Sequence, residues 1–140
     1  MKEDFIEEFK KAITSTVKVI ADNKDLEVIF DNNSFESEGI IILPKIENES
    51  DLNSLSSLRG RADNKALMHR FHNKEIFENN SPQGEKNKKI YEVLENTRVQ
   101  IIGSNMMRGV RANLNSLYEK WCNDNNILSA NEQSDIDIQN

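Results

Sequence analysis

The sequence predicts a single, mostly helical α+β domain of three or four helices with a short two-stranded β-hairpin. Apolar residues recur at three- and four-residue spacing near the start of the chain and again in two later stretches, as on the buried face of a helix. Two short β-branched runs lie between the first helical stretch and the second. A chain of 140 residues suits one domain with a real core.

The first part of the chain is expected to hold one helix and the hairpin. Apolar side chains follow one helical stripe over residues 5–20. Residues 26–30 and 39–43 are strand-like runs joined by a polar loop, which predicts a β-hairpin over residues 26–43. A lone hairpin is marginal in water, so we expect it to pack on helices or to extend a partner's sheet.

Two longer helical stretches follow, at residues 55–77 and 85–121. Residues 79–84 separate them and include Ser81-Pro82-Gln83-Gly84, which favour a turn. The first stretch begins either near Asp51 or only after Gly60.

One apolar stripe is expected along the last helical stretch. It consists of Ile90, Leu94, Ile101, Met106, Val110, Leu114, Leu117 and Trp121. Gly103 and Gly109 interrupt this stretch, and we expect them to kink or divide the helix or to let another helix approach closely.

Charge is distributed unevenly along the chain. The net charge is −6, with −6 on residues 1–50, +4 on residues 51–122 and −4 on residues 123–140. The overall sign argues against nucleic acid as a partner. We expect a helical domain over residues 1–122 and an acidic, disordered tail or linker start over residues 123–140. With no long apolar run and no basic signal-peptide start, the sequence predicts a cytoplasmic protein without a membrane segment.

Three polar residues stand out on the predicted helices. Asp63 is expected either to cap the start of a helix or to pair with Arg98. Arg98 falls on the apolar stripe, where a buried guanidinium needs a carboxylate or several carbonyls, and Glu92 or Glu95 is the other available carboxylate partner. Asn113 lies on the same stripe and is expected to satisfy a backbone group at a helix crossing.

The alternative function is a degenerate metallohydrolase-like domain, in which the two histidines bind a metal. His69 and His72 are three residues apart, whereas helical zinc sites usually place two histidines four apart with a glutamate beside the first. One exposed and one packed histidine is the favoured interpretation, over a metal held by His69, His72 and a glutamate such as Glu95. Neither a Walker motif nor a convincing nucleophile–base arrangement is present, and with Cys122 as the single cysteine, catalysis by this chain alone is not expected.

Two stretches resemble a known family. Residues 58–67, Leu-Arg-Gly-Arg-Ala-Asp-Asn-Lys-Ala-Leu, with His72 five residues later, resemble a block of the CobT subunit of aerobic cobaltochelatase. Residues 98–114, from Arg-Val-Gln to Gly-Val-Arg-Ala-Asn-Leu, resemble a second block of that family. Gln100 and Asn73 stand where the family has Glu and commonly Asp.

The resemblance implies the amino-terminal domain of a cobaltochelatase subunit that acts in cobalamin biosynthesis. The family's complex inserts cobalt into hydrogenobyrinic acid a,c-diamide and uses ATP with Mg²⁺, so this domain is expected to hold no cofactor of its own and to be inactive alone. Its implied partners are an AAA+ ATPase subunit and a large tetrapyrrole-binding subunit, while longer family members continue through an acidic linker into a von Willebrand factor A-type domain. The residues expected to hold helices together or to contact a partner are Arg59, Gly60, Asp63, His72, Arg98, Gly103, Gly109 and Asn113.

Overall fold

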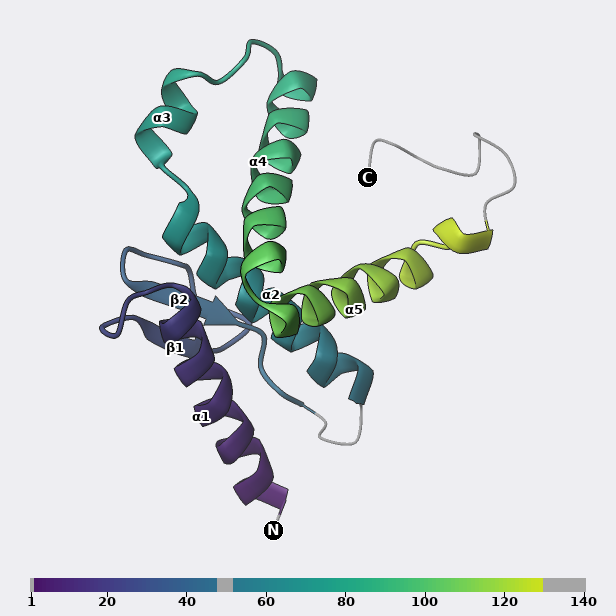
Figure 1. Cartoon of the computed structure of the whole chain (residues 1–140). Coiled ribbons are helices and arrows are strands. Elements are labelled where there is room, and N and C mark those ends of the chain that lie inside the picture. The colour runs from purple at the N-terminus through teal and green to yellow at the C-terminus, as the bar shows by residue number, and fades with distance from the viewer. Residues whose placement is uncertain (1, 48–51, 130–140) are drawn as a thin grey trace.

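Five α-helices, two short strands and one 3-10 turn make up the part of the chain that the computed structural model describes, residues 2–47 and 52–129 (Figure 1). In chain order these elements are α1 (Lys2–Ile20), β1 (Glu27–Phe30), β2 (Ile40–Leu43), α2 (Leu52–Phe71), α3 (Lys74–Asn79), α4 (Glu85–Met106), α5 (Arg108–Asp124) and η1 (Ile127–Ser129). The predicted α+β, mostly helical class is confirmed. None of the helices in these residues is long and apolar enough to cross a membrane.

The two strands do not form the predicted hairpin. β1 and β2 pair in parallel, with Glu27 opposite Ile40 and Phe30 opposite Leu43. Parallel and antiparallel pairs use strands of the same length and the same β-branched composition, so these features of the sequence do not reveal which pairing forms. The direction depends on the connection, residues 31–39, which returns the chain to the starting end of β1 and ends at Gly39, where φ is 78°.

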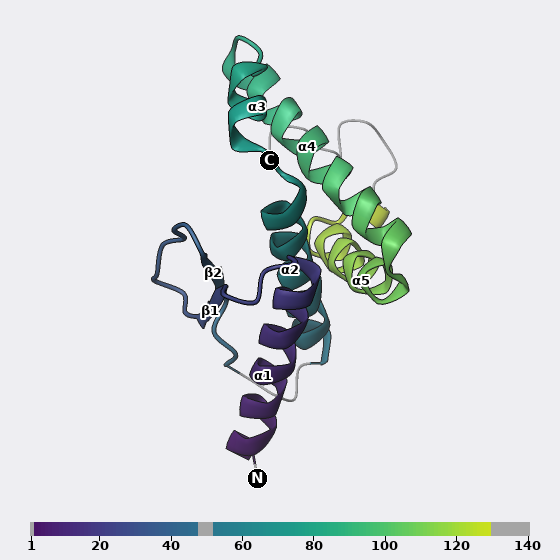
Figure 2. The same cartoon turned by 60° about the vertical axis from the view of Figure 1, so that its left-hand side comes forward.

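Helix α2 is the central element of the fold. It packs against α1, α4, α5 and β2, so its buried residues do not form one stripe (Figure 2). The buried residues are Leu55, Ser57, Leu58, Gly60, Ala62, Asp63, Ala66 and Leu67. The start near Asp51 was the correct alternative, because the helix begins at Leu52. Asp63 therefore lies inside the helix, and its expected capping role is wrong.

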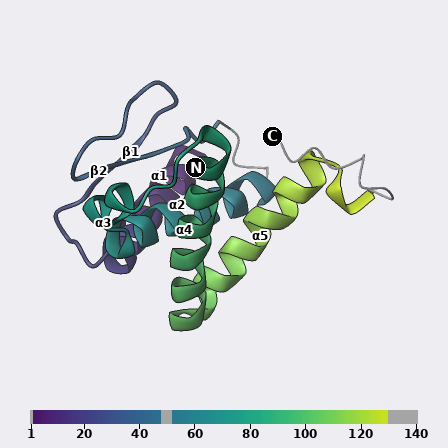
Figure 3. The same ribbon diagram turned by 90° about the horizontal axis from the view of Figure 1, so that it is seen from above.

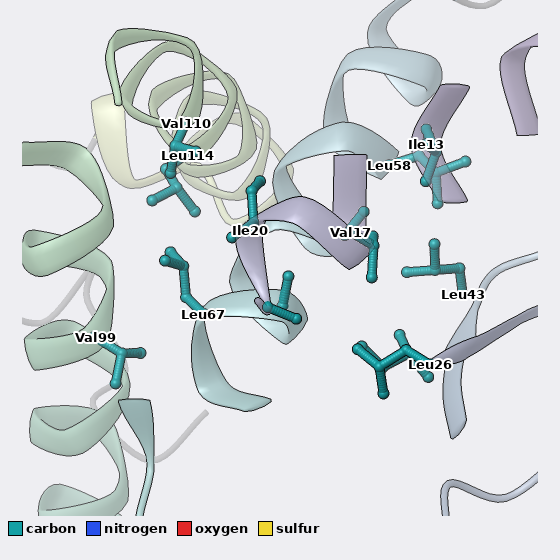
Figure 4. Close-up of a cluster of buried hydrophobic side chains, with 14 of the residues drawn as sticks. Ile13, Val17, Ile20, Leu26, Leu43, Leu58, Leu67, Val99, Val110 and Leu114 are labelled. Carbon is teal, nitrogen blue, oxygen red and sulfur yellow. The ribbon is translucent and has the colours of Figure 1, made fainter. Parts of the chain in front are cut away.

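The core forms where α2 meets its neighbours. Figure 4 shows side chains from α1, β2, α2, α4 and α5 converging on this region, together with Leu26, which lies just before β1. The largest fully buried side chains are Leu26, Leu43, Leu67, Val17 and Val99. Each of the elements that surround α2 thus contributes at least one apolar side chain to a shared core.

Two of the predicted helices are divided. The stretch at 55–77 ends at Phe71, and α3 begins after Asn73, whose side-chain oxygen accepts a hydrogen bond from the Ile76 N–H at 3.0 Å. The last stretch breaks at Met107, whose extended backbone (φ −139°, ψ 119°) turns α5 away from α4, as Figure 3 shows. The break lies between the two glycines, at neither of them.

The predicted apolar stripe holds for the first half of α5, does not extend to Trp121, which is 50% exposed, and fails for α4. Val110 and Leu114 are buried as expected. On α4, however, Leu94 is 61% exposed, and the buried residues are Val99, Gln100 and Gly103. α5 also continues to Asp124 and is followed by η1, where an irregular tail was expected from Asn123. The rest of that predicted tail, residues 130–140, lies outside the described residues.

Candidate functional site

Helices α2 and α5 cross at Gly60. A Cβ atom on Gly60 would lie 2.5 Å from the backbone oxygen of Asn113 and 2.8 Å from Cβ of Leu117. The first of these neighbours is backbone and cannot rotate away. Gly60 therefore permits this crossing because it has no side chain.

Gly103 has a similar role where α4 crosses α2, and Gly109 does not. A Cβ atom on Gly103 would lie 2.5 Å from both terminal methyl groups of Leu67, a fully buried side chain. No atom outside its own helix neighbourhood lies within 4 Å of the corresponding position on Gly109. Two of the three predicted glycines thus mark close helix contacts.

Asp63 lies beside the first of these crossings. It is 2% exposed, and its Oδ2 accepts a hydrogen bond from Nδ2 of Asn113 at 2.7 Å. Burial raises the pKa of Asp63, while the Asn113 hydrogen bond and the nearby Arg59 charge oppose that rise. The Arg59 guanidinium itself lies over the Phe9 ring, 5.1 Å from its centroid. The Arg59–Phe9 contact links α2 to α1, and the Asp63–Asn113 hydrogen bond links α2 to α5.

A second chain of polar side chains joins α2, α4 and α5. Nε2 of Gln100 donates to Oδ1 of Asn64 at 2.9 Å, and the Tyr118 hydroxyl donates to Oε1 of Gln100. With Asp63 and Asn113, these three residues form what we call the junction cluster. Gln100 is 6% exposed, so its hydrogen bonds replace those it would make with water.

His72 and Arg98 belong to a different group, which we call the arm cluster. Glu95 is its centre, because Oε1 lies 2.9 Å from Nδ1 of His72 and both carboxylate oxygens accept hydrogen bonds from Arg98 at 2.8 Å. Arg98 also donates to the carbonyl of Phe71 at 2.8 Å. The Arg98 hydrogen bonds, supported by His72, lower the pKa of Glu95 to about 2.

Aromatic contacts extend the arm cluster to α3. The rings of Phe77 and Tyr91 stack with centroids 4.4 Å apart, and His72 meets Phe77 edge-on at 5.0 Å. The Tyr91 hydroxyl donates to the Phe77 carbonyl at 3.2 Å. The short helix α3 contains no buried residue, so these contacts are its main attachment to α4.

The geometry separates the partners that the sequence had left open. Arg98 pairs with Glu95, and the proposed pair with Asp63 is wrong because Asp63 is bound to Asn113 in the other cluster. Arg98 is also exposed, with 49% of its side chain accessible, where burial had been expected.

The structure gives no support to the alternative metal site. His69 is exposed and takes no part in the arm cluster, although His72 does contact Glu95. Within residues 2–47 and 52–129, no group of three or more His, Cys, Asp and Glu side chains is arranged to hold a metal ion.

Some members of both clusters were not singled out from the sequence. Asn64 follows Asp63 directly and Tyr118 lies near the end of α5, but a single sequence holds no signal that they meet at Gln100. Gln100 was noticed only as a departure from a family pattern. Its amide both donates and accepts here, whereas a carboxylate would only accept.

One exposed surface is also organised. Ile90, Val93, Leu94 and Ile101 are each more than half exposed. The helical repeat of about 3.6 residues per turn places all four on the side of α4 opposite Val99. We call this surface the apolar α4 face. Exposed lysines Lys86, Lys88 and Lys89 lie at its amino-terminal end.

The fold and its contacts define a helical domain whose buried polar residues link helices and whose α4 carries an exposed apolar face. Residues 3–140 match the model of the family described as Cobalamin biosynthesis protein CobT. The chain belongs to the CobT family, which implies a role in cobalamin biosynthesis. No solved structure matches the chain significantly.

Proposed function

We propose that this chain is an assembly domain of a cobaltochelatase, the complex that inserts cobalt into hydrogenobyrinic acid a,c-diamide with ATP. The proposal rests on the apolar α4 face, because exposed apolar side chains that cluster on one surface often mark an interaction site, whereas scattered single ones do not. Its four residues are 52–64% exposed and are not covered by any other described part of the chain.

The polar residues support assembly more than chemistry. Asp63 and Asn113 bind each other, and Glu95 is shared between His72 and Arg98. A carboxylate held by an arginine, with a pKa of about 2, is a poor general base near neutral pH. The side chains that resemble the family's blocks therefore hold α2, α4 and α5 in place and present the α4 face in one orientation.

The partner of the α4 face is expected to be apolar with an acidic rim, to match the lysines at its amino-terminal end. The AAA+ ATPase subunit and the large tetrapyrrole-binding subunit are the two candidates. Binding of this chain to each purified subunit, measured by biolayer interferometry, distinguishes them.

The decisive variant is Leu94→Glu, which places a carboxylate in the centre of the α4 face. We expect it to weaken binding to the true partner by about tenfold or more, since it desolvates a charge and repels an acidic rim. Val19→Glu is the matched control, because Val19 is an exposed apolar residue on α1, 73% exposed, away from this face. Unchanged binding of Leu94→Glu to both subunits, or equal loss in Val19→Glu, would contradict the proposal.

A second measurement concerns the domain by itself. We expect the pure chain to hydrolyse no ATP and to insert no cobalt, because its sequence contains no Walker motif and no convincing nucleophile–base arrangement. A phosphate-release assay with the purified chain tests this. Turnover that follows the protein through successive purification steps would contradict an assembly role without chemistry.

A further inference from the structure

A second surface feature lies at the amino-terminal half of α2, away from the arm cluster. It is a pocket of about 430 Å³ between the segment after β2, the first half of α2 and the end of α5. Its lining includes Asn32, Lys45, Leu55, Leu58, Arg61 and Lys120. A volume of this size is typical of pockets that bind small organic molecules.

Cationic groups dominate the charge of this pocket. Lys45, Arg61 and Lys120 come from three different segments, and Glu47 is the one acidic residue among the described lining residues. Lys120 is held by Asp124, with 3.1 Å between Nζ and Oδ2. Arg61 makes no hydrogen bond or ion pair within the described ranges, so its guanidinium is available to a ligand.

The rest of the lining is apolar and well supported. Leu55 and Leu58 are each 6% exposed and belong to the core, so they form a firm floor. The backbone N–H of Lys45 donates to Oδ1 of Asn32 at 3.0 Å, which fixes the segment after β2 against the end of β1. Buried apolar atoms beside a free guanidinium favour a ligand that has both an apolar body and an anionic group.

We propose that this pocket binds a small organic anion that carries a phosphate or carboxylate group on an apolar body. The Arg61 guanidinium binds the anionic group in a bidentate manner, while Lys45 and Lys120 add positive charge at the rim. The apolar body contacts Leu55 and Leu58. This site is separate from the apolar α4 face and does not depend on the assembly role.

The test uses 1-naphthyl phosphate as the probe and isothermal titration calorimetry with the whole chain. We expect saturable binding that weakens with added salt. Inorganic phosphate is expected to bind more weakly than 1-naphthyl phosphate because it lacks the apolar body. 2-Naphthylmethanol is also expected to bind more weakly, because it lacks the negative charge. 1-Naphthoate separates the two anion types, and tighter binding of either anion identifies the preferred group.

Arg61→Gln is expected to weaken binding of 1-naphthyl phosphate about tenfold or more, as loss of a charge-assisted contact does. Arg61 is exposed and unpaired in the described structure, so this variant should fold normally, which circular dichroism checks. Lys11→Gln removes a positive charge from the exposed surface of α1 and should leave binding unchanged. The proposal is overturned by absence of saturable binding, by unchanged affinity in Arg61→Gln, or by equal loss in Lys11→Gln. We expect Arg61→Gln to bind the partner subunit normally. Failure of the pocket proposal can therefore be distinguished from failure of the proposed assembly role.

Discussion

Two carboxylates of this chain are held in opposite ways. Asp63 is buried beside a neutral amide, and its pKa is raised because burial disfavours the charged form. Glu95 lies between a guanidinium and an imidazole, and its pKa falls to about 2 because both neighbours favour the charged form. The Asp63 contact thus joins a carboxyl group to an uncharged amide, whereas the Glu95 contact joins a carboxylate to a cation.

The pH dependence of stability should report the Glu95 contact. A folded pKa below the unfolded value means that this carboxylate stabilises the fold above about pH 4.5, and that the contribution is lost as the pH falls from there to about 2. Because Arg98 is half exposed, we expect on the order of 1 kcal/mol after solvent screening. Urea unfolding of wild type and Glu95→Gln should therefore differ near neutral pH and converge at low pH. Glu92→Gln, an exposed neighbour, should follow wild type throughout, and a constant gap for Glu95→Gln would refute the ionic role.

A double-mutant cycle should show coupling between Asp63 and Asn113. Asn113→Ala leaves the buried Asp63 carboxyl without its partner, and Asp63→Ala leaves the partly buried Asn113 amide without its partner. We expect a loss of stability of about 1–3 kcal/mol in each single variant, and a loss in the double variant that is smaller than the sum of the two. Asp63→Asn should cost less than Asp63→Ala, because it keeps an acceptor and removes the buried charge. Chemical unfolding measures all of these. Variants of Asp63 and Arg98 should change the free energy of unfolding additively, because these two residues do not contact each other. Coupling between them would contradict the observed partners.

At the scale of elements, α2 is the shared contact surface of the helical part. α5 crosses it at Gly60, and α4 crosses it near Gly103. Small residues at these points bring the backbones close, and polar side chains beside them satisfy groups that water can no longer reach. The two helix crossings therefore depend on the small size of Gly60 and Gly103 as much as on contacts between apolar side chains.

Alanine substitutions at the glycines should separate packing from helix propensity. Gly60→Ala is expected to destabilise the fold by about 1–3 kcal/mol or more, because its Cβ would overlap the Asn113 backbone. Gly103→Ala should cost less, since the Leu67 methyl groups can move in part. Gly109→Ala should be neutral or stabilising by up to about 1 kcal/mol, because the site is open and alanine favours a helix. Thermal unfolding gives the order, and equal effects at Gly60 and Gly109 would disprove the close crossing.

At the scale of the molecule, α3 and the first half of α4 extend away from the body, as Figures 1 and 2 show. The body holds the buried core, whereas this arm is attached through the Phe77–Tyr91 stack and the Glu95 contacts. All of the apolar α4 face except Ile101 lies on the arm, so the orientation of this face depends on the arm cluster.

Removal of the Tyr91 ring should loosen the arm and leave the body intact. In Tyr91→Ala we expect faster amide hydrogen exchange in α3 and in the first half of α4, because α3 has no buried residue to hold it. Exchange at core residues such as Val17 and Leu67 should be unchanged. Val93→Ala removes an exposed side chain from the same helix and serves as the control. Slow exchange of α3 in Tyr91→Ala would show that other contacts attach it.

The helical α+β class and the places of the first helix and both strands could be predicted from local patterns, because periodicity and β-branched runs act over a few residues. The importance of Gly60, Asp63 and Asn113 was also visible, since glycine and polar residues on a helical stripe need a reason. Which residues they meet was not, because Asp63 and Asn113 are 50 positions apart.

The sequence by itself therefore determined which segments are helix or strand and which polar residues need partners. The tertiary structure decided strand direction, the division at Met107 and the buried side of α4. Each of these depends on where distant segments pack. After β1 the chain must loop back so that β2 runs parallel to β1. In α4, Val99 packs against the body of the fold while Leu94 faces outward. An apolar stripe in a sequence marks a surface that avoids water, but it does not say whether the chain's own core or a partner covers it.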